Sequence, residues 1–274
     1  MSKKRKKIIL LSIIALVILM FGIVFLRHPK GRALLKSKSH FKEHRADSRI
    51  LFEPGAEEYA KKIADFFPEA IKQVEKGHYL PFTKPFKVYV CSTQQSHNAF
   101  IGNPTSYPIR GSAFNGDVYI APSAFSFKEL DTHRESLMHE LSHLHLRQRL
   151  GIFKTMRIPH WFREGLANII AGSGGEGVTE DMAIQAIKEG RHFKVQDRGG
   201  YFKSLSKIIV EAGLTGPMFH MQNKMFVRYI KNMNPEAFKK LVIALQKKDT
   251  FSIAFLNHFE MNPEQTWERF KSEL

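Results

Sequence analysis

A run of 19 residues without a charged side chain, residues 8–26, constrains this 274-residue chain more than any other feature. At about 1.5 Å per residue, a helix of this length spans roughly 28 Å, close to the hydrocarbon thickness of a bilayer. A cleaved signal peptide is the alternative. The run is long for one, however, and residues 26–29 that end it offer no small-residue cleavage site. We therefore predict an uncleaved transmembrane anchor at residues 8–26.

The charges on the two sides of this anchor do not decide its orientation in the membrane. Five Lys/Arg precede it and five follow it by Lys38, so the positive-inside rule gives no clear bias. A tail as short as residues 1–7 more usually stays cytoplasmic. We therefore expect a single-pass protein of the cell membrane, with the tail inside, residues 27–50 as a basic juxtamembrane linker, and residues 51–274 as a domain outside.

The formal net charge of +16 is concentrated around the anchor. Residues 1–38 contain ten Lys/Arg and no acid, which leaves 32 Lys/Arg against 26 Asp/Glu for the remainder. Basic residues that flank an apolar span can bind anionic lipid headgroups. No nucleic-acid recognition motif accompanies the charge, so we expect membrane lipids as partners and no nucleic acid.

The pattern of apolar residues predicts strands first and helices afterwards. A strand is expected at residues 86–91, and two short strands are expected around an Asn115-Gly116 turn within residues 111–122. Helices are expected at residues 54–77, with Pro68 kinking or splitting the helix, and at residues 93–100, 130–150 and 159–171. After about residue 182 the chain reads as helices broken at glycine and proline. This order indicates an α+β fold with a helical C-terminal half.

The sequence H-E-L-S-H at residues 139–143 lies within one of these predicted helices. Four residues make slightly more than one helical turn, so the imidazoles of His139 and His143 project from one face and can bind one zinc ion. Glu140 lies beside them, where a carboxylate can take the proton of an activated water. The alternative is a surface helix rich in histidine, because His133 and His145 are nearby. Both lie off the face of the motif, so we interpret them as non-ligands.

A carboxylate that could complete this site follows 21 residues after His143, in P-H-W-F-R-E-G-L-A at residues 159–167. Pro159 suits a helix start and places Glu164 in the second turn. A His₂Glu set leaves one coordination position open, as catalytic zinc needs. Gly165 would allow close approach to the first helix. The alternative is that Glu164 is an ordinary glutamate on a helix.

Together, H-E-L-S-H and W-F-R-E-G-L-A resemble the motifs of gluzincin metallopeptidases, in particular the compact M1-like "peptidase MA" domains of bacterial membrane and secreted proteins. The resemblance covers residues 80–274, although its specific part is these two motifs. It implies a zincin-like fold with a small mixed sheet and a helical half carrying the zinc site. It also implies one zinc ion per chain and hydrolysis of peptide bonds.

The resemblance carries over to three further places. Residues 113–120 match the strand along which substrate lies in the family, although a plain hairpin is an equal reading. Asn168 occupies the position of a carboxylate that orients a metal-binding histidine, and an amide can accept the same hydrogen bond without adding charge. His220 aligns with a tyrosine taken to stabilise the tetrahedral oxyanion, a role that protonated imidazole could fill. Alternatively, His220 is a surface residue.

The sequence thus predicts a zinc metallopeptidase with His139, His143 and Glu164 as ligands, Glu140 as general base and His220 as a second catalytic residue. The expected substrate is a peptide or protein. Two alternatives share the metal site: a catalytically degenerate scaffold at the membrane, and a zinc-dependent hydrolase of a non-peptide amide. The sequence determines neither the oligomeric state nor endopeptidase against exopeptidase action.

Overall fold

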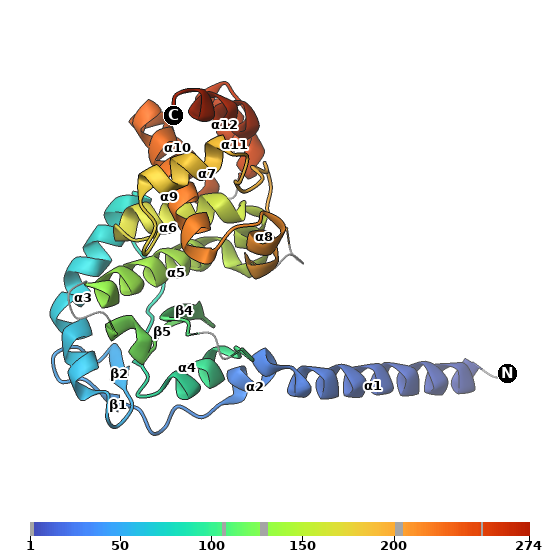
Figure 1. Cartoon of the computed structure of the whole chain (residues 1–274). Coiled ribbons are helices and arrows are strands. Elements are labelled where there is room, and N and C mark those ends of the chain that lie inside the picture. Colours follow the sequence, from blue (N-terminus) through green and yellow to red (C-terminus); the bar gives the residue numbers. More distant parts are fainter. Residues whose placement is uncertain (1–2, 106–107, 127–130, 201–204, 248) are drawn as a thin grey trace.

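A computed structural model describes residues 3–105, 108–126, 131–200, 205–247 and 249–274. These residues form an α+β structure in which a small sheet precedes a largely helical half, so the α+β part of the predicted fold class is confirmed. Helix α1 (Lys3–Arg27) extends away from the rest of the chain (Figure 1). Its segment Ile9–Arg27, with a mean hydropathy of 3.2, is long and apolar enough to cross a membrane.

The sheet is mixed and has five short strands. These are β1 (Lys42–Glu43), β2 (Ile50–Phe52), β3 (Val88–Val90), β4 (Gly111–Phe114) and β5 (Asp117–Ile120), arranged in the order β1-β2-β3-β5-β4. The inner strands β2, β3 and β5 are parallel, whereas β1 and β4 run antiparallel at the two edges. The hairpin around Asn115 and Gly116 is confirmed as β4 and β5. Strands β1 and β2 were not expected from the sequence.

The two faces of the sheet bury different side chains because neighbouring residues of a strand alternate. Val88, Val90, Val118 and Ile120 face the main core, which α3 (Glu57–His78) and α5 (Thr132–Arg157) cover. Tyr89 and Tyr119 face a smaller cluster with Phe41, Phe100 and Ile101, beneath α4 (Gln94–Ile101). The sheet is therefore covered on both faces, as its short apolar strands require.

Residues 27–50, expected as a linker, lie against this second face. They form α2 (Pro29–Leu35) and β1, and Phe41 is buried on the sheet. The ammonium group of Lys38 lies 3.1 Å from Asp117 and 4.3 Å from the centre of the Tyr89 ring. His40 contacts Glu53 at 3.0 Å. Phe41, Lys38 and His40 therefore tie the chain after α1 to the domain.

The predicted helices of the first half are present. Helix α3 is one helix that contains Pro68, so the expectation that Pro68 could split it was wrong. Thr93 caps α4 by accepting a hydrogen bond from the Ser96 amide at 3.0 Å. In α5 the regular helix is interrupted at Gly151, where φ is 71° and ψ is 170°. A short η1 turn (Pro122–Phe125) connects β5 to the start of α5.

The second half is helical over its described residues. Its helices are α6 (His160–Ala171), α7 (Glu180–Lys188), α8 (Leu205–Glu211), α9 (Gly216–Met233), α10 (Pro235–Gln246), α11 (Phe251–Phe259) and α12 (Pro263–Ser272). Helix α6 packs between α5 and α9. Gly165 faces α9, because a Cβ added there would lie 2.6 Å from the Asn223 carbonyl oxygen. The expectation that Gly165 faces the first helix, α5, was therefore wrong.

Candidate metal centre

Helix α5 carries two imidazoles, and the packing of its buried face sets their direction. Leu137, Leu141 and Leu144 are buried in the main core and fix the rotation of the helix. His139 and His143, four residues apart, then project together from a partly buried face toward α6. The sequence prediction that both lie on one face of a helix is confirmed.

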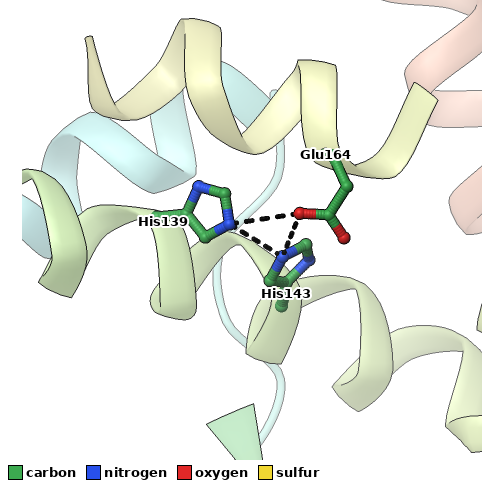
Figure 2. A group of neighbouring side chains, drawn as sticks. All are labelled: His139, His143 and Glu164. Carbon is green, nitrogen blue, oxygen red and sulfur yellow. Dashed lines mark hydrogen bonds and ion pairs between the residues drawn. The ribbon is translucent and has the colours of Figure 1, made fainter. Parts of the chain in front are cut away.

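Helix α6 supplies the third group. Most of its side chains are buried because it packs between α5 and α9, and Glu164 is only 7% exposed. Figure 2 shows the Glu164 carboxylate pointing from α6 toward the two imidazoles of α5. A buried carboxylate needs a charged or hydrogen-bonding partner. Its partners here are the nitrogen atoms of His139 and His143.

The three ligand atoms form a nearly equilateral triangle. His139 Nε2 lies 3.1 Å from His143 Nε2, and Glu164 Oε2 lies 3.3 Å and 3.4 Å from these two nitrogens. For bonds of about 2.0–2.1 Å at the tetrahedral angle, ligand atoms around zinc lie about 3.3–3.4 Å apart. The triangle therefore matches one face of such a tetrahedron, and this group could hold a metal ion.

The pKa shifts of Glu164 and His139 favour the ionised form of the Glu164 carboxylate. Burial would raise the pKa of Glu164, but the charge of His143 and the hydrogen bonds with both imidazoles hold it well below its usual range. Burial would likewise lower the pKa of His139, but its hydrogen bond with Glu164 and the charge of Glu140 raise it. A protonated His139 and an ionised Glu164 attract each other. A bound cation would take the place of the proton on the imidazole.

Glu140 points toward the edge strand of the sheet. Its Oε2 accepts a hydrogen bond from the Ala113 amide of β4 at 2.7 Å. The carboxylate can approach this closely because residue 111 is glycine: an added Cβ would lie 2.8 Å from Glu140 Cγ. Gly111 therefore leaves room for the Glu140 side chain, and the Ala113 amide holds its carboxylate.

Arg147, one helical turn beyond His143, contacts the same strand. Its guanidinium donates a hydrogen bond to the Ala113 carbonyl oxygen. Burial lowers the pKa of Arg147, whereas the charges of Glu140 and Glu164 act to raise it. Both backbone groups of Ala113 are thus engaged by α5 side chains in this state. An extended peptide that paired with β4 at this residue would have to replace those two hydrogen bonds.

Asn168 links the metal group to α9. It hydrogen-bonds the side chain of His139, and its Nδ2 donates to His220 Nδ1 at 3.2 Å and to Asn223 Oδ1 at 3.1 Å. Ser173 donates to the Asn168 Oδ1 at 3.3 Å. Asn168 therefore lies where the sequence prediction needs it, in contact with His139, one of the three possible metal ligands.

His220 lies near the metal group, with its ring centre 6.0 Å from that of His139. Burial lowers the pKa of His220 to about 4, so the imidazole is neutral near pH 7. Asn168 Nδ2 lies 3.2 Å from His220 Nδ1 and 3.3 Å from the His220 carbonyl oxygen, and a neutral ring that accepts from Asn168 at Nδ1 carries its proton on Nε2. Any hydrogen bond that His220 gives is therefore from a neutral ring and not from the imidazolium that the sequence suggested.

The neighbouring histidines lie elsewhere. His145 is buried on the opposite face of α5, where it contacts the Leu80 carbonyl oxygen at 2.8 Å and stacks on His78 with ring centres 4.3 Å apart. Burial lowers the pKa of His145 to about 4, as suits a neutral core residue. His133 stacks on Phe125. Neither belongs to the group of possible metal ligands.

Sequence reasoning did not single out Gly111, Arg147 or Asn223. The first two act through β4, and only the folded chain brings that strand to α5. Asn223 is completely buried and contacts Asn168. A signal was available for Arg147, because its spacing of four and eight residues from His143 and His139 places it on the same helix face.

Comparison with known proteins adds no family: no protein-family model and no curated protein matches this sequence. The function must therefore be argued from the site itself.

Proposed function

We propose that this chain is a membrane-anchored zinc metallopeptidase. The observation that carries the proposal is the triangle of His139 Nε2, His143 Nε2 and Glu164 Oε2, with sides of 3.1, 3.3 and 3.4 Å. Two imidazoles and one carboxylate form a ligand set typical of catalytic zinc, which keeps one position open. Nitrogen-rich sites of this kind suit zinc better than magnesium or calcium. One ion per chain is expected.

The residues around this group are arranged for hydrolysis. A zinc ion held there would supply Lewis-acid chemistry, activating a water molecule and polarising a carbonyl group. Glu140 follows His139 directly and is not one of the three ligands, so its carboxylate is free to accept the water proton and to deliver it to the leaving amine. The hydrogen bond from the Ala113 amide fixes the Glu140 carboxylate at the edge strand.

His220 is the proposed oxyanion donor. Its Nε2–H would provide a neutral hydrogen bond to a substrate oxygen beside the metal ligands, while Asn168 fixes the ring from the other side. Asn168 also contacts His139, so one amide orients both a ligand and the proposed donor. This arrangement supports the role that the family resemblance gave to His220, with a different protonation state.

A peptide is the proposed substrate because of the edge strand. Helix α5 packs against β4, which is the last strand in the strand order. A peptide that paired with β4 at Ala113 would displace the side chains of Glu140 and Arg147 from its backbone groups. An extended peptide can add to such an edge by backbone hydrogen bonds. This arrangement, with the two motifs, supports a zincin-like fold and membership of the gluzincins.

The location is proposed from α1. A helix of this length and apolar composition suits a single membrane span. The short basic tail before it would remain cytoplasmic, with the domain outside the cell membrane. The ten Lys/Arg of residues 1–38 would bind lipid headgroups on the two sides of the span.

The decisive experiment measures metal content and proteolysis on one sample. The full-length chain, purified in detergent, should contain about one zinc per chain. It should also cleave an unstructured protein such as casein. A chelator should abolish cleavage, and added zinc should restore it.

Three results would contradict the proposal. Absence of zinc, together with no uptake on addition, would refute the metal site. Stoichiometric zinc with no cleavage of any unfolded protein would favour a metal-binding scaffold without hydrolysis. Cleavage that survives complete removal of the metal would point to a different active site.

The close approach at Gly111 gives a further prediction. In Gly111→Ala the new Cβ would displace the Glu140 side chain, since the two atoms cannot remain 2.8 Å apart. Displacing a catalytic group by about 1 Å can cost up to ~100-fold in rate, and we expect casein cleavage to fall at least about tenfold. Zinc content should not change. Gly200→Ala is the matched control, because an added Cβ there has no neighbour within 4 Å. Equal activity of both variants would refute the role of Gly111.

A further inference from the structure

Large apolar side chains that are exposed outside α1 concentrate on three elements. Eight such side chains are exposed among the described residues after Arg27. Five of them lie on α2, on the end of α5 and on α8, and these are Leu34, Leu35, Ile152, Phe153 and Val210. We call these five the α1-side surface. The two most exposed of the eight, Val210 at 76% and Phe153 at 75%, both belong to it.

Ile152 and Phe153 lie at a bend of the chain whose backbone is held by hydrogen bonds. The interruption of α5 at Gly151 turns the chain, and these two residues follow it directly. The segment is then held from both ends. Thr155 donates to the Gly151 carbonyl oxygen at 2.8 Å, and the Gly199 amide donates to the Arg157 carbonyl oxygen at 2.7 Å. Their exposure therefore does not come from a frayed helix end.

Helix α8 presents its apolar residues in two directions. Leu205, Ile208 and Ile209 pack against the main core, whereas Val210 is exposed. The core contacts of the helix therefore do not require an apolar residue at position 210. Val210 therefore joins Ile152 and Phe153 as an apolar side chain that is exposed although it belongs to a packed helix.

The charge around the α2 and α5 parts of this surface is positive, whereas α8 carries one basic and one acidic residue, Lys207 and Glu211. Between Glu140 and Glu164 the chain contains no acidic residue, while Arg149, Lys154 and Arg157 flank the exposed bend. The segment from Arg27 to Lys38, which includes α2, is equally free of acid and has five Lys/Arg. Apolar side chains with basic neighbours are typical of segments that lie in the headgroup region of an anionic bilayer.

The position of these elements relates them to the anchor. Figure 1 shows α5 running across the domain toward the side from which α1 extends, and α8 lies on that same side. Residues 38–41 tie the start of the domain to the sheet, so α1 and the α1-side surface belong to one connected structure. If α1 crosses a bilayer, that surface faces the same headgroup layer.

We propose that the α1-side surface is a second membrane contact, with Ile152, Phe153 and Val210 inserted among the headgroups of an anionic lipid bilayer. The inference rests on the proposed membrane span of α1 but not on the proposed peptidase activity. Two separate contacts would hold the domain at a fixed height above the bilayer.

Fluorescence quenching in vesicles tests this contact. The full-length chain would be labelled with a small fluorophore at Phe153→Cys, Val210→Cys, Ser12→Cys or Lys72→Cys, and reconstituted into phosphatidylcholine and phosphatidylglycerol containing nitroxide lipids. Position 12 lies in α1 and reports the anchor. Position 72 lies on α3, on the opposite side of the domain (Figure 1), and is the exposed control. Cys91, the only native cysteine, is fully buried, and the unsubstituted chain gives the labelling background.

We expect the nitroxide lipids to reduce fluorescence at positions 12, 153 and 210 by about twofold or more, and to leave position 72 unchanged. Omitting phosphatidylglycerol, or introducing Lys154→Glu, should weaken quenching at 153 and 210 alone.

Three results would overturn the contact. Quenching at position 12 without quenching at 153 and 210 would refute the second contact and leave the anchor in place. Absence of quenching at position 12 would refute the anchor and this inference with it, whatever the peptidase assay shows. Energy transfer between labelled chains at position 153, without lipid quenching, would show a second copy on the surface in place of lipid.

Discussion

Glu140→Gln is expected to lower casein cleavage by about 10²–10⁴-fold, the range that a positioned general acid–base group contributes. Glutamine has nearly the same shape, and its amide oxygen can still accept the hydrogen bond that Ala113 donates at 2.7 Å. It cannot accept a proton from water near neutral pH. Zinc content should remain at one per chain, because Glu140 is not among the three possible ligands.

Glu135→Gln is the matched control for this variant. It makes the same change of charge on the same helix, five residues earlier and outside the ligand group. We expect it to keep both zinc and activity. Full activity of Glu140→Gln would exclude Glu140 as the base. Loss of zinc in Glu140→Gln would mean that this carboxylate helps to hold the metal.

His143→Ala is expected to remove both metal and activity. Losing an outer partner of a metal ligand already costs about 10–100-fold in affinity, and losing one of three ligands should cost more. The Glu164 carboxylate, 3.4 Å from His143 Nε2, would then lie buried with one partner fewer. Zinc content measured after dialysis should fall from about one per chain to near zero.

Thermal unfolding provides a second readout for the same variant. A metal that binds only the folded chain raises its stability, so a chelator should lower the melting temperature of the unsubstituted protein. It should have no effect on His143→Ala. His133→Ala is the control, since His133 lies on the same helix but stacks on Phe125. If His143→Ala binds zinc as tightly as His133→Ala, then His143 is not a ligand.

The helix that carries the motif could be predicted from the sequence because its determinants are local. Leu137, Leu141 and Leu144 recur at helical spacing, which fixes the buried face and with it the direction of His139 and His143. The Asn115-Gly116 turn is equally local, since both residues adopt positive φ. Elements of this kind follow from a few neighbouring residues.

Strands β1 and β2 could not be predicted, because they form through pairing with other strands. Strand β2 pairs with β3, about 40 residues later in the chain, and β1 pairs with β2. The packing of residues 36–43 on the sheet also depends on distant residues. Lys38 forms an ion pair with Asp117, and the Phe41 ring packs edge-to-face against Tyr89. Basic and polar composition alone resembles that of a flexible linker.

The sequence by itself determined the apolar N-terminal helix, the order of sheet and helices, and the shared helix face of His139 and His143. Each of these depends on spacing within a few turns. Only the tertiary structure decided that Glu164 lies within 3.4 Å of both imidazoles, that Gly165 faces α9, and that Glu140 is held by the amide of Ala113. These contacts join segments that are 20 or more residues apart. Their geometry depends on how the helices and the sheet pack, which no local pattern specifies.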